Sequence, residues 1–129
     1  MDNRQTAIVL FAHGSGVPEA NRQVASVAGD ISRRSGCAAG CAFLEIAQPD
    51  LAAAAAALVQ AGARRIVVVP YFLTMGVHVG QDLPRLIDVQ RTRFPEVEFL
   101  LGQPLEGSPG LPALILERVR EVLPEGQPL

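Results

Sequence analysis

The chain has 129 residues, of which 49% are hydrophobic and 19% charged, so it can bury a core and does not have a disordered composition. Its formal net charge of −2 excludes the strongly basic character of nucleic-acid-binding domains. No apolar run approaches the roughly 20 residues of a membrane-spanning helix, and the N-terminus has no signal-peptide pattern. We therefore expect a cytoplasmic protein with neither a nucleic-acid nor a membrane partner.

Strand-like and helix-like segments alternate from the N-terminus onward. Residues 6–12 are a continuous apolar run rich in β-branched side chains, which is typical of a strand buried on both faces. Apolar residues at helical spacing predict a helix over 19–34, which a Ser-Gly pair ends. A second strand is expected over 41–46. A second helix is expected over 49–60, with a proline and an aspartate in its first turn.

The second half of the chain continues this alternation. It is expected to hold a strand, a loop, a helix, a strand and a final helix, in the ranges 64–72, 73–80, 81–94, 96–101 and 111–123. Pro84 is placed in the first turn of its helix, where its missing N–H costs little. Residues 124–129 are expected to be a frayed tail.

The order of elements is therefore βαβαβαβα, with connections long enough for parallel pairing. This order predicts an α/β fold with an open four-stranded parallel sheet between two helical layers. The expected strand order is 2-1-3-4, the flavodoxin-like kind, whose topological switch point lies between strands 1 and 3. No repeat or linker divides the sequence, so residues 1–129 are expected to form a single domain.

The two histidines of the chain each follow a predicted strand. His13 comes directly after the first strand, His78 lies in the loop after the third, and Glu45 lies at the end of the second. Parallel strands bring their carboxyl ends to one edge of the sheet, where ligands bind beside the switch point. Two imidazoles and a carboxylate suit Co(II), Ni(II), Fe(II) or Zn(II), and three protein ligands leave positions open for exchange. Taken singly, a histidine is more often solvated, and Glu45 could pair with an arginine.

The segment His13-Gly14-Ser15-Gly16 is open to other interpretations. An H-G-x-G segment occurs in the oxyanion holes of α/β hydrolases, but the chain has no G-x-S-x-G elbow. Histidine phosphatases carry an arginine before the His-Gly pair, and here that residue is Ala12. No phosphate-binding G-x-x-x-x-G-K-[ST] segment is present, so no nucleotide is expected. The spacing of Cys37 and Cys41 favours reduced, buried thiols over a zinc or redox site.

Three segments together carry a family resemblance: FAHGS at 11–15, AFLEIAQPDL at 42–51 and VVVPYFLTMGVHVGQDLP at 67–84. With them the chain resembles the class II chelatases, in particular the short sirohydrochlorin chelatases of the CbiX and SirB kind. The third segment is the most specific, because P-Y-F-L, G-x-H and D-x-P occur together at the family spacing. With the order of strands and helices, the resemblance covers nearly the whole chain.

The resemblance implies a substrate, a reaction and a site. Family members insert a divalent metal into sirohydrochlorin without ATP, in cobalamin or sirohaem biosynthesis, and Co(II) is expected here before Fe(II) or Ni(II). The metal-binding and catalytic residues of the family correspond to His13, His78 and Glu45. Longer relatives hold two such units facing a shared cleft, so this single-unit chain is expected to pair as a homodimer.

A second group of residues is expected to contact the macrocycle. It comprises a loop serine, a basic residue for the substrate carboxylates, and apolar residues near strand ends that could equally be ordinary core. These residues are Ser15, Phe43, Leu44, Tyr71, Phe72, Leu73, Met75 and Arg85. The chain departs from the family pattern at Gly16, Val17 and Gln103, where relatives often carry charged or histidine residues. The alternative is therefore a diverged, non-catalytic carrier of tetrapyrrole or metal.

Overall fold

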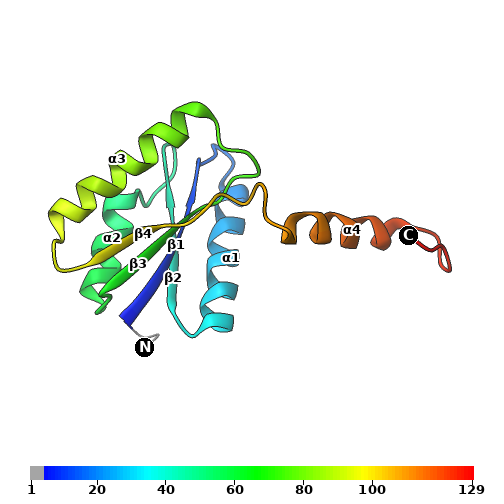
Figure 1. Ribbon diagram of the computed structural model, residues 1–129, viewed down its shortest axis with the longest axis horizontal. Coiled ribbons are helices and arrows are strands. Elements are labelled where there is room, and N and C mark those ends of the chain that lie inside the picture. The colour runs from blue at the N-terminus through cyan, green and yellow to red at the C-terminus, as the bar shows by residue number, and fades with distance from the viewer. Residues whose placement is uncertain (1–4) are drawn as a thin grey trace.

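Four parallel strands form the centre of the molecule, with α1 on one face and α2 and α3 on the other (Figure 1). The computed structural model describes residues 5–129, apart from the side chain of His78. The elements are β1 (Thr6–Ala12), α1 (Pro18–Ser35), β2 (Ala38–Phe43), α2 (Leu51–Gln60), β3 (Arg65–Pro70), α3 (Val77–Arg93), β4 (Glu98–Leu101) and α4 (Gly110–Val122). The strand order is β2-β1-β3-β4, which confirms the predicted fold class.

The central strand β1 is apolar from Ala7 to Ala12 because both of its faces are covered. Val9 and Phe11 point into the core under α2 and α3, and each has no exposed surface. Leu10 lies on the opposite face and packs against Val24 and Ala28 of α1. The strand therefore has no polar side, as expected for a sheet with helices on both faces.

Local sequence signals set the ends of the first two helices. Gly36 ends α1 in the left-handed conformation with φ +74°, and its N–H donates to the carbonyl of Ser32. Asp50 caps α2, and its carboxylate accepts a 2.8 Å hydrogen bond from the N–H of Ala53. The helix therefore begins at Leu51, and Asp50 lies directly before its first turn instead of within it.

The second strand lies three residues earlier than the sequence pattern predicted. It covers Ala38–Phe43, where 41–46 was expected. Beyond Phe43 the chain keeps two more hydrogen bonds to the neighbouring segment and then turns at Ile46, whose φ is +73°. Glu45 therefore lies in the turn after β2. The apolar residues Leu44 and Ala47 pack on the core although they lie beyond the strand, which is why the sequence pattern placed the strand too far along the chain.

The third helix begins earlier than predicted, which corrects the placement of His78. Helix α3 starts at Val77, so the backbone of His78 lies in the first helical turn and Pro84 lies inside the helix. Its packing residues Val79, Leu83 and Ile87 recur every four residues and are 9%, 0% and 1% exposed. Burial of this stripe against the sheet holds the first turns in helical form despite the proline.

The last helix projects outward from the sheet instead of covering it (Figure 1). None of its residues from Gly110 to Val122 is buried. Within residues 5–129, no helix combines the length and apolar character needed to cross a membrane.

Candidate metal site at the carboxyl edge of the sheet

His13 and Glu45 lie at the carboxyl edge of the sheet, where the predicted topology placed them, and their side chains are in contact. The His13 Nε2 atom lies 3.3 Å from the Glu45 Oε1 atom. His13 directly follows β1, and Glu45 follows the neighbouring strand β2 by two residues. Both side chains are about half exposed, at 51% and 58%, so the pair is open to a ligand from solvent.

Backbone hydrogen bonds continue past the ends of β1 and β2 as far as these two residues. The N–H of Leu44 donates to the carbonyl of Ala12 at 2.9 Å, and the N–H of Glu45 donates to the carbonyl of His13 at 3.1 Å. The parallel pairing of β1 and β2 thus continues to the site itself. These main-chain hydrogen bonds hold the backbone of both residues at adjacent positions.

Gly14 allows the two segments to approach this closely. Its φ is +98°, and a Cβ atom built on it would lie 2.0 Å from the backbone oxygen of Glu45. No real side chain tolerates such a contact, so only glycine fits this position. The sequence marked Gly14 as a turn residue, but the close approach to Glu45 could not be predicted from it.

The loop after His13 is closed by the side chain of Asn21 in the first turns of α1. The Asn21 Oδ1 atom accepts a 3.0 Å hydrogen bond from the N–H of Ser15, and its Nδ2 atom donates a 2.8 Å bond to the Ser15 carbonyl. The Ser15 hydroxyl accepts a further 3.0 Å bond from the N–H of Val17. The predicted substrate residue Ser15 therefore has its backbone held by α1, with its hydroxyl directed to the turn.

The distance between the two donor atoms fits a shared divalent ion. Two metal–ligand bonds of about 2.1 Å that meet at about 100° place the donor atoms about 3.2 Å apart. The observed separation of His13 Nε2 and Glu45 Oε1 is 3.3 Å. The other ring nitrogen, Nδ1, lies 3.3 Å from the Gly14 carbonyl, and a proton on Nδ1 leaves Nε2 free to bind a metal.

Among the residues whose side chains are described, which leave out 1–4 and His78, no three groups of the metal-binding types gather at one point. His13 and Glu45 form a pair, and the predicted third residue, His78, is placed only by its backbone in the first turn of α3. The pair can supply two of the ligands of a metal.

The predicted apolar contact residues divide between the two faces of the sheet. Phe43 is 3% exposed in the α1-side core, where Tyr71 also packs half-buried. On the opposite face, Leu44, Phe72 and Met75 pack against the core as half-buried side chains. The structure therefore does not gather them into one wall. These residues flank the edge that holds His13 and Glu45.

The remaining predicted contacts, Leu73 and Arg85, are both exposed. Leu73 is 68% exposed and borders a cavity of about 470 Å³ between its loop and α4, whereas Arg85 lies on the outer side of α3.

Sequence reasoning missed one contact between two loops of the carboxyl edge. The Glu106 carboxylate accepts a 3.1 Å hydrogen bond from the N–H of Met75 and ties the loop after β4 to the loop after β3. The two residues are 31 positions apart, and no sequence signal points to their contact.

Comparison with known proteins confirms the predicted family resemblance. The model of the CbiX family matches residues 7–122. The chain is 31% identical to the sirohydrochlorin ferrochelatase of Priestia megaterium, over 89% of this chain and 44% of that protein. It is 26% identical to the sirohydrochlorin cobaltochelatase of Methanopyrus kandleri, over 92% of this chain and 98% of that protein. The chain therefore spans under half of the first relative and nearly all of the second.

Solved structures show the same fold. A CbiX protein from Marinobacter aquaeolei VT8 superposes with a TM-score of 0.79 at 28% identity, over 90% of this chain and 95% of that one. The sirohydrochlorin chelatase SirB from Bacillus subtilis subspecies spizizenii, solved in complex with cobalt, superposes with a TM-score of 0.81 at 25% identity. That match covers 92% of this chain and 51% of SirB, so the chain corresponds to about half of SirB.

Proposed function

The chain belongs to the CbiX family, and we propose that it inserts a divalent metal ion into a sirohydrochlorin-type tetrapyrrole without ATP. The observation that carries the proposal is the His13–Glu45 pair, 3.3 Å apart at the carboxyl edge of the sheet beside the switch point. The similar proteins are named as sirohydrochlorin ferrochelatase and cobaltochelatase, which supports this substrate. We propose Co(II) first and Fe(II) or Ni(II) next, in cobalamin or sirohaem biosynthesis.

In the proposed reaction the metal is a substrate that the protein holds only briefly. His13 Nε2 and a Glu45 oxygen each donate a lone pair to the ion, and His78 is proposed as a third ligand. Fewer than six protein ligands leave coordination positions where the pyrrole nitrogens can replace water. Because both described ligands are about half exposed, a flat macrocycle can approach the ion from the solvent side.

Insertion also requires the loss of two pyrrole protons. The Glu45 carboxylate can accept one as its bond to the metal lengthens, and the histidines are suited to proton transfer near neutral pH. The protons then pass to solvent through the open edge. The macrocycle loses two protons as it gains the dipositive ion, so its charge is unchanged and no nucleotide or redox partner is needed.

We further propose that two copies of the chain act together. The chain matches about half the length of SirB and of the Priestia ferrochelatase, so two copies supply the two units of such a protein. Ser15 and the apolar residues beside the edge are proposed to contact the macrocycle, and Arg85 to bind its carboxylates.

The direct test is metal insertion followed by visible absorption under anaerobic conditions, with sirohydrochlorin, no ATP, and Co(II), Fe(II) or Ni(II) in turn. We expect acceleration over the protein-free rate, which is lost in His13→Ala, His78→Ala and Glu45→Gln. Glu96→Gln, which neutralises an exposed carboxylate after α3, is the matched control and should keep the wild-type rate. Wild-type rates in both histidine variants would show that the site assignment is wrong.

The same experiment separates the alternative function, a tetrapyrrole or metal carrier. This alternative is favoured by the loop positions Gly16 and Val17, and by Gln103, where charged or histidine residues are expected in relatives. A carrier would shift the spectrum of the bound macrocycle with no acceleration by any of the three ions. Such a result would refute the chelatase proposal.

A further inference from the structure

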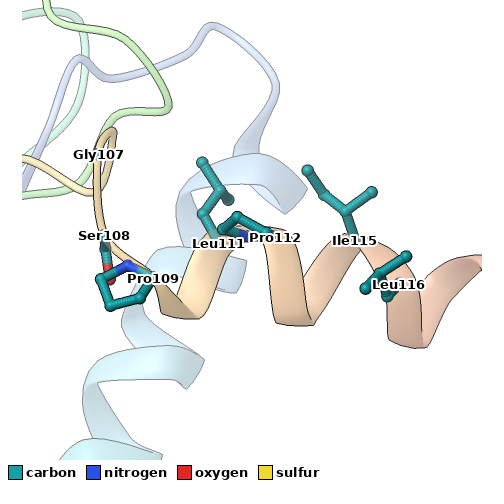
Figure 2. Close-up of a pocket in the computed structure, with 7 residues that line it drawn as sticks. All are labelled: Gly107, Ser108, Pro109, Leu111, Pro112, Ile115 and Leu116. Atoms are coloured by element: carbon teal, nitrogen blue, oxygen red, sulfur yellow. The ribbon is translucent and has the colours of Figure 1, made fainter.

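Helix α4 exposes a continuous apolar stripe. Leu111, Ile115, Val119 and Val122 recur at helical spacing, and Ile115 and Val122 are 54% and 82% exposed. Leu111 and Ile115 project from the same side of the helix (Figure 2). A cavity of about 530 Å³ lies along this side and is lined by Leu111, Ile115 and neighbouring residues. In proteins, most of the stability of such a helix comes from packing of its apolar face.

The sheet has a matching uncovered surface on its α1 side. Helix α1 packs over β1 and β2, whereas β3 and β4 carry no helix on this face. Val67 and Leu100 are register partners there, and Val69 lies two residues along β3. Leu100 is 41% exposed and the two valines are half-buried. The alternate residues of these strands, such as Ile66, point into the core under α3. Val69 also packs at the edge of the α1-side core. We name Val67 and Leu100, together with Val69 beside them, the open sheet face.

The connection from β4 directs α4 away from its own sheet. Glu106 is bound to the N–H of Met75, which anchors the middle of the connection to the loop after β3. The Ser108 hydroxyl accepts a 3.2 Å bond from the N–H of Gly110, and the Ser108 carbonyl accepts one from Leu111 at 3.1 Å. Pro109, directly before the helix, has a fixed φ. The Glu106 contact anchors the connection, and the local contacts of Ser108 shape the first turn of the outward-pointing helix.

We propose that two copies of the chain exchange their α4 helices, each packing its apolar stripe on the open sheet face of the other copy. The occupant is a second copy because one chain carries both complementary surfaces and its connection separates them. Under two-fold symmetry the exchange forms the same contact twice and leaves neither surface open. This inference rests on the pairing proposed above and specifies its interface. It also places the Leu73 loop beside the exchanged helix, since the cavity of about 470 Å³ is lined by Leu73, Leu111 and Ile115.

A pair of introduced cysteines tests the exchange in the full-length chain. Leu100→Cys combined with Ile115→Cys should form a covalent dimer under mild oxidation, seen on a non-reducing gel. Leu100→Cys with Ala113→Cys is the matched control, because Ala113 lies on the other side of the helix, and it should remain uncrosslinked. The chain without introduced cysteines controls for the native thiols.

The possible outcomes separate this inference from the proposed function. A covalent monomer that has lost its two introduced thiols would show that α4 folds back on its own sheet, which overturns the exchange. An uncrosslinked protein with the mass of a dimer would keep the pairing but overturn this interface. Metal insertion, measured separately, bears only on the function.

A second variant pair measures the contribution of the stripe. Ile115→Asp should weaken the dimer at least about 100-fold in dissociation constant, because the contact is lost twice per dimer. Ala113→Asp, the same change on the polar side, should leave it within about threefold. Light scattering over a concentration series gives both values. Equal dissociation constants for the two variants would overturn the proposal.

Discussion

The backbone of Gly14 passes very close to the Glu45 carbonyl, and a substitution at Gly14 tests whether this approach organises the site. We consider Gly14→Ala, which adds a single methyl group next to His13. Gly14 has φ +98°, and the added Cβ would lie 2.0 Å from the Glu45 carbonyl oxygen. Gly16→Ala makes the same chemical change two residues later, where a Cβ meets nothing within 4 Å and no positive φ constrains the backbone. Gly16→Ala is therefore the matched control.

The expected size of the effect follows from these two observations. An alanine held at a positive φ costs about 1–3 kcal/mol of folding free energy. In addition, real Cβ atoms essentially never come within 3.0 Å of another atom, so the two segments must separate by about 1 Å to accommodate the methyl group. The contacted atom is backbone, so the shift moves Glu45 itself away from His13. A misplacement of about 1 Å in a reacting group can lower a rate about 100-fold.

Two measurements on the same samples check the prediction. Urea unfolding should show Gly14→Ala destabilised by at least about 1–3 kcal/mol relative to the wild type, because the backbone clash adds to the cost of the positive φ, with Gly16→Ala within about 0.5 kcal/mol. The proposed insertion of metal into sirohydrochlorin should fall about 100-fold in Gly14→Ala alone. If Gly14→Ala matches Gly16→Ala in both stability and rate, the close approach does not organise the site and the reasoning is refuted.

Three further changes test other parts of the structure. Asn21→Ala removes both hydrogen bonds to the Ser15 backbone and should cost about 1–3 kcal/mol in urea unfolding, with a slower insertion rate; unchanged values would show that the loop holds itself. Asp50→Ala removes the cap on the N–H of Ala53 and should cost about 1 kcal/mol with no change in insertion rate, so a lost rate would contradict its purely structural role. Burial raises the pKa of the Cys41 thiol, so at pH 8 less of it is thiolate than in the unfolded chain. Iodoacetamide should therefore label Cys41 more slowly in the native protein than in urea, as followed by mass spectrometry, and equal rates would contradict the burial.

The parts of the fold that follow from local pattern were predictable from the sequence. The continuous apolar strands and the helical spacing between them fix the alternation of elements, and right-handed parallel connections restrict the strand order. The boundaries were less predictable, because tertiary packing decides them. Helix α3 reaches back to Val77 because Val79 is buried on the sheet, although Gly80 and Pro84 argue locally against a helix there.

The outward direction of α4 was beyond prediction for a similar reason. Its residues predict a helix correctly, but its placement depends on the contact of Glu106 with the N–H of Met75, 31 residues earlier in the chain. The short-range sequence pattern predicts which face of a helix is apolar, but it does not predict which surface covers that face. The sequence predicted that His13 and Glu45 lie at the same edge, because the ends of neighbouring parallel strands meet there, but their 3.3 Å contact could not be predicted from topology alone.

The separation of the two site residues depends on strand register as well as on topology. Ala12 and Phe43 are register partners in β1 and β2, and the hydrogen bonds that follow carry the same pairing to His13 and Glu45. A slip of one residue would turn the buried Phe43 toward the opposite face and move Glu45 away from the imidazole. The burial of Phe43, at 3% exposure, therefore opposes such a slip. The core residues of β2 thus contribute to the geometry of the His13–Glu45 pair, and the same register places Gly14 directly against the Glu45 carbonyl.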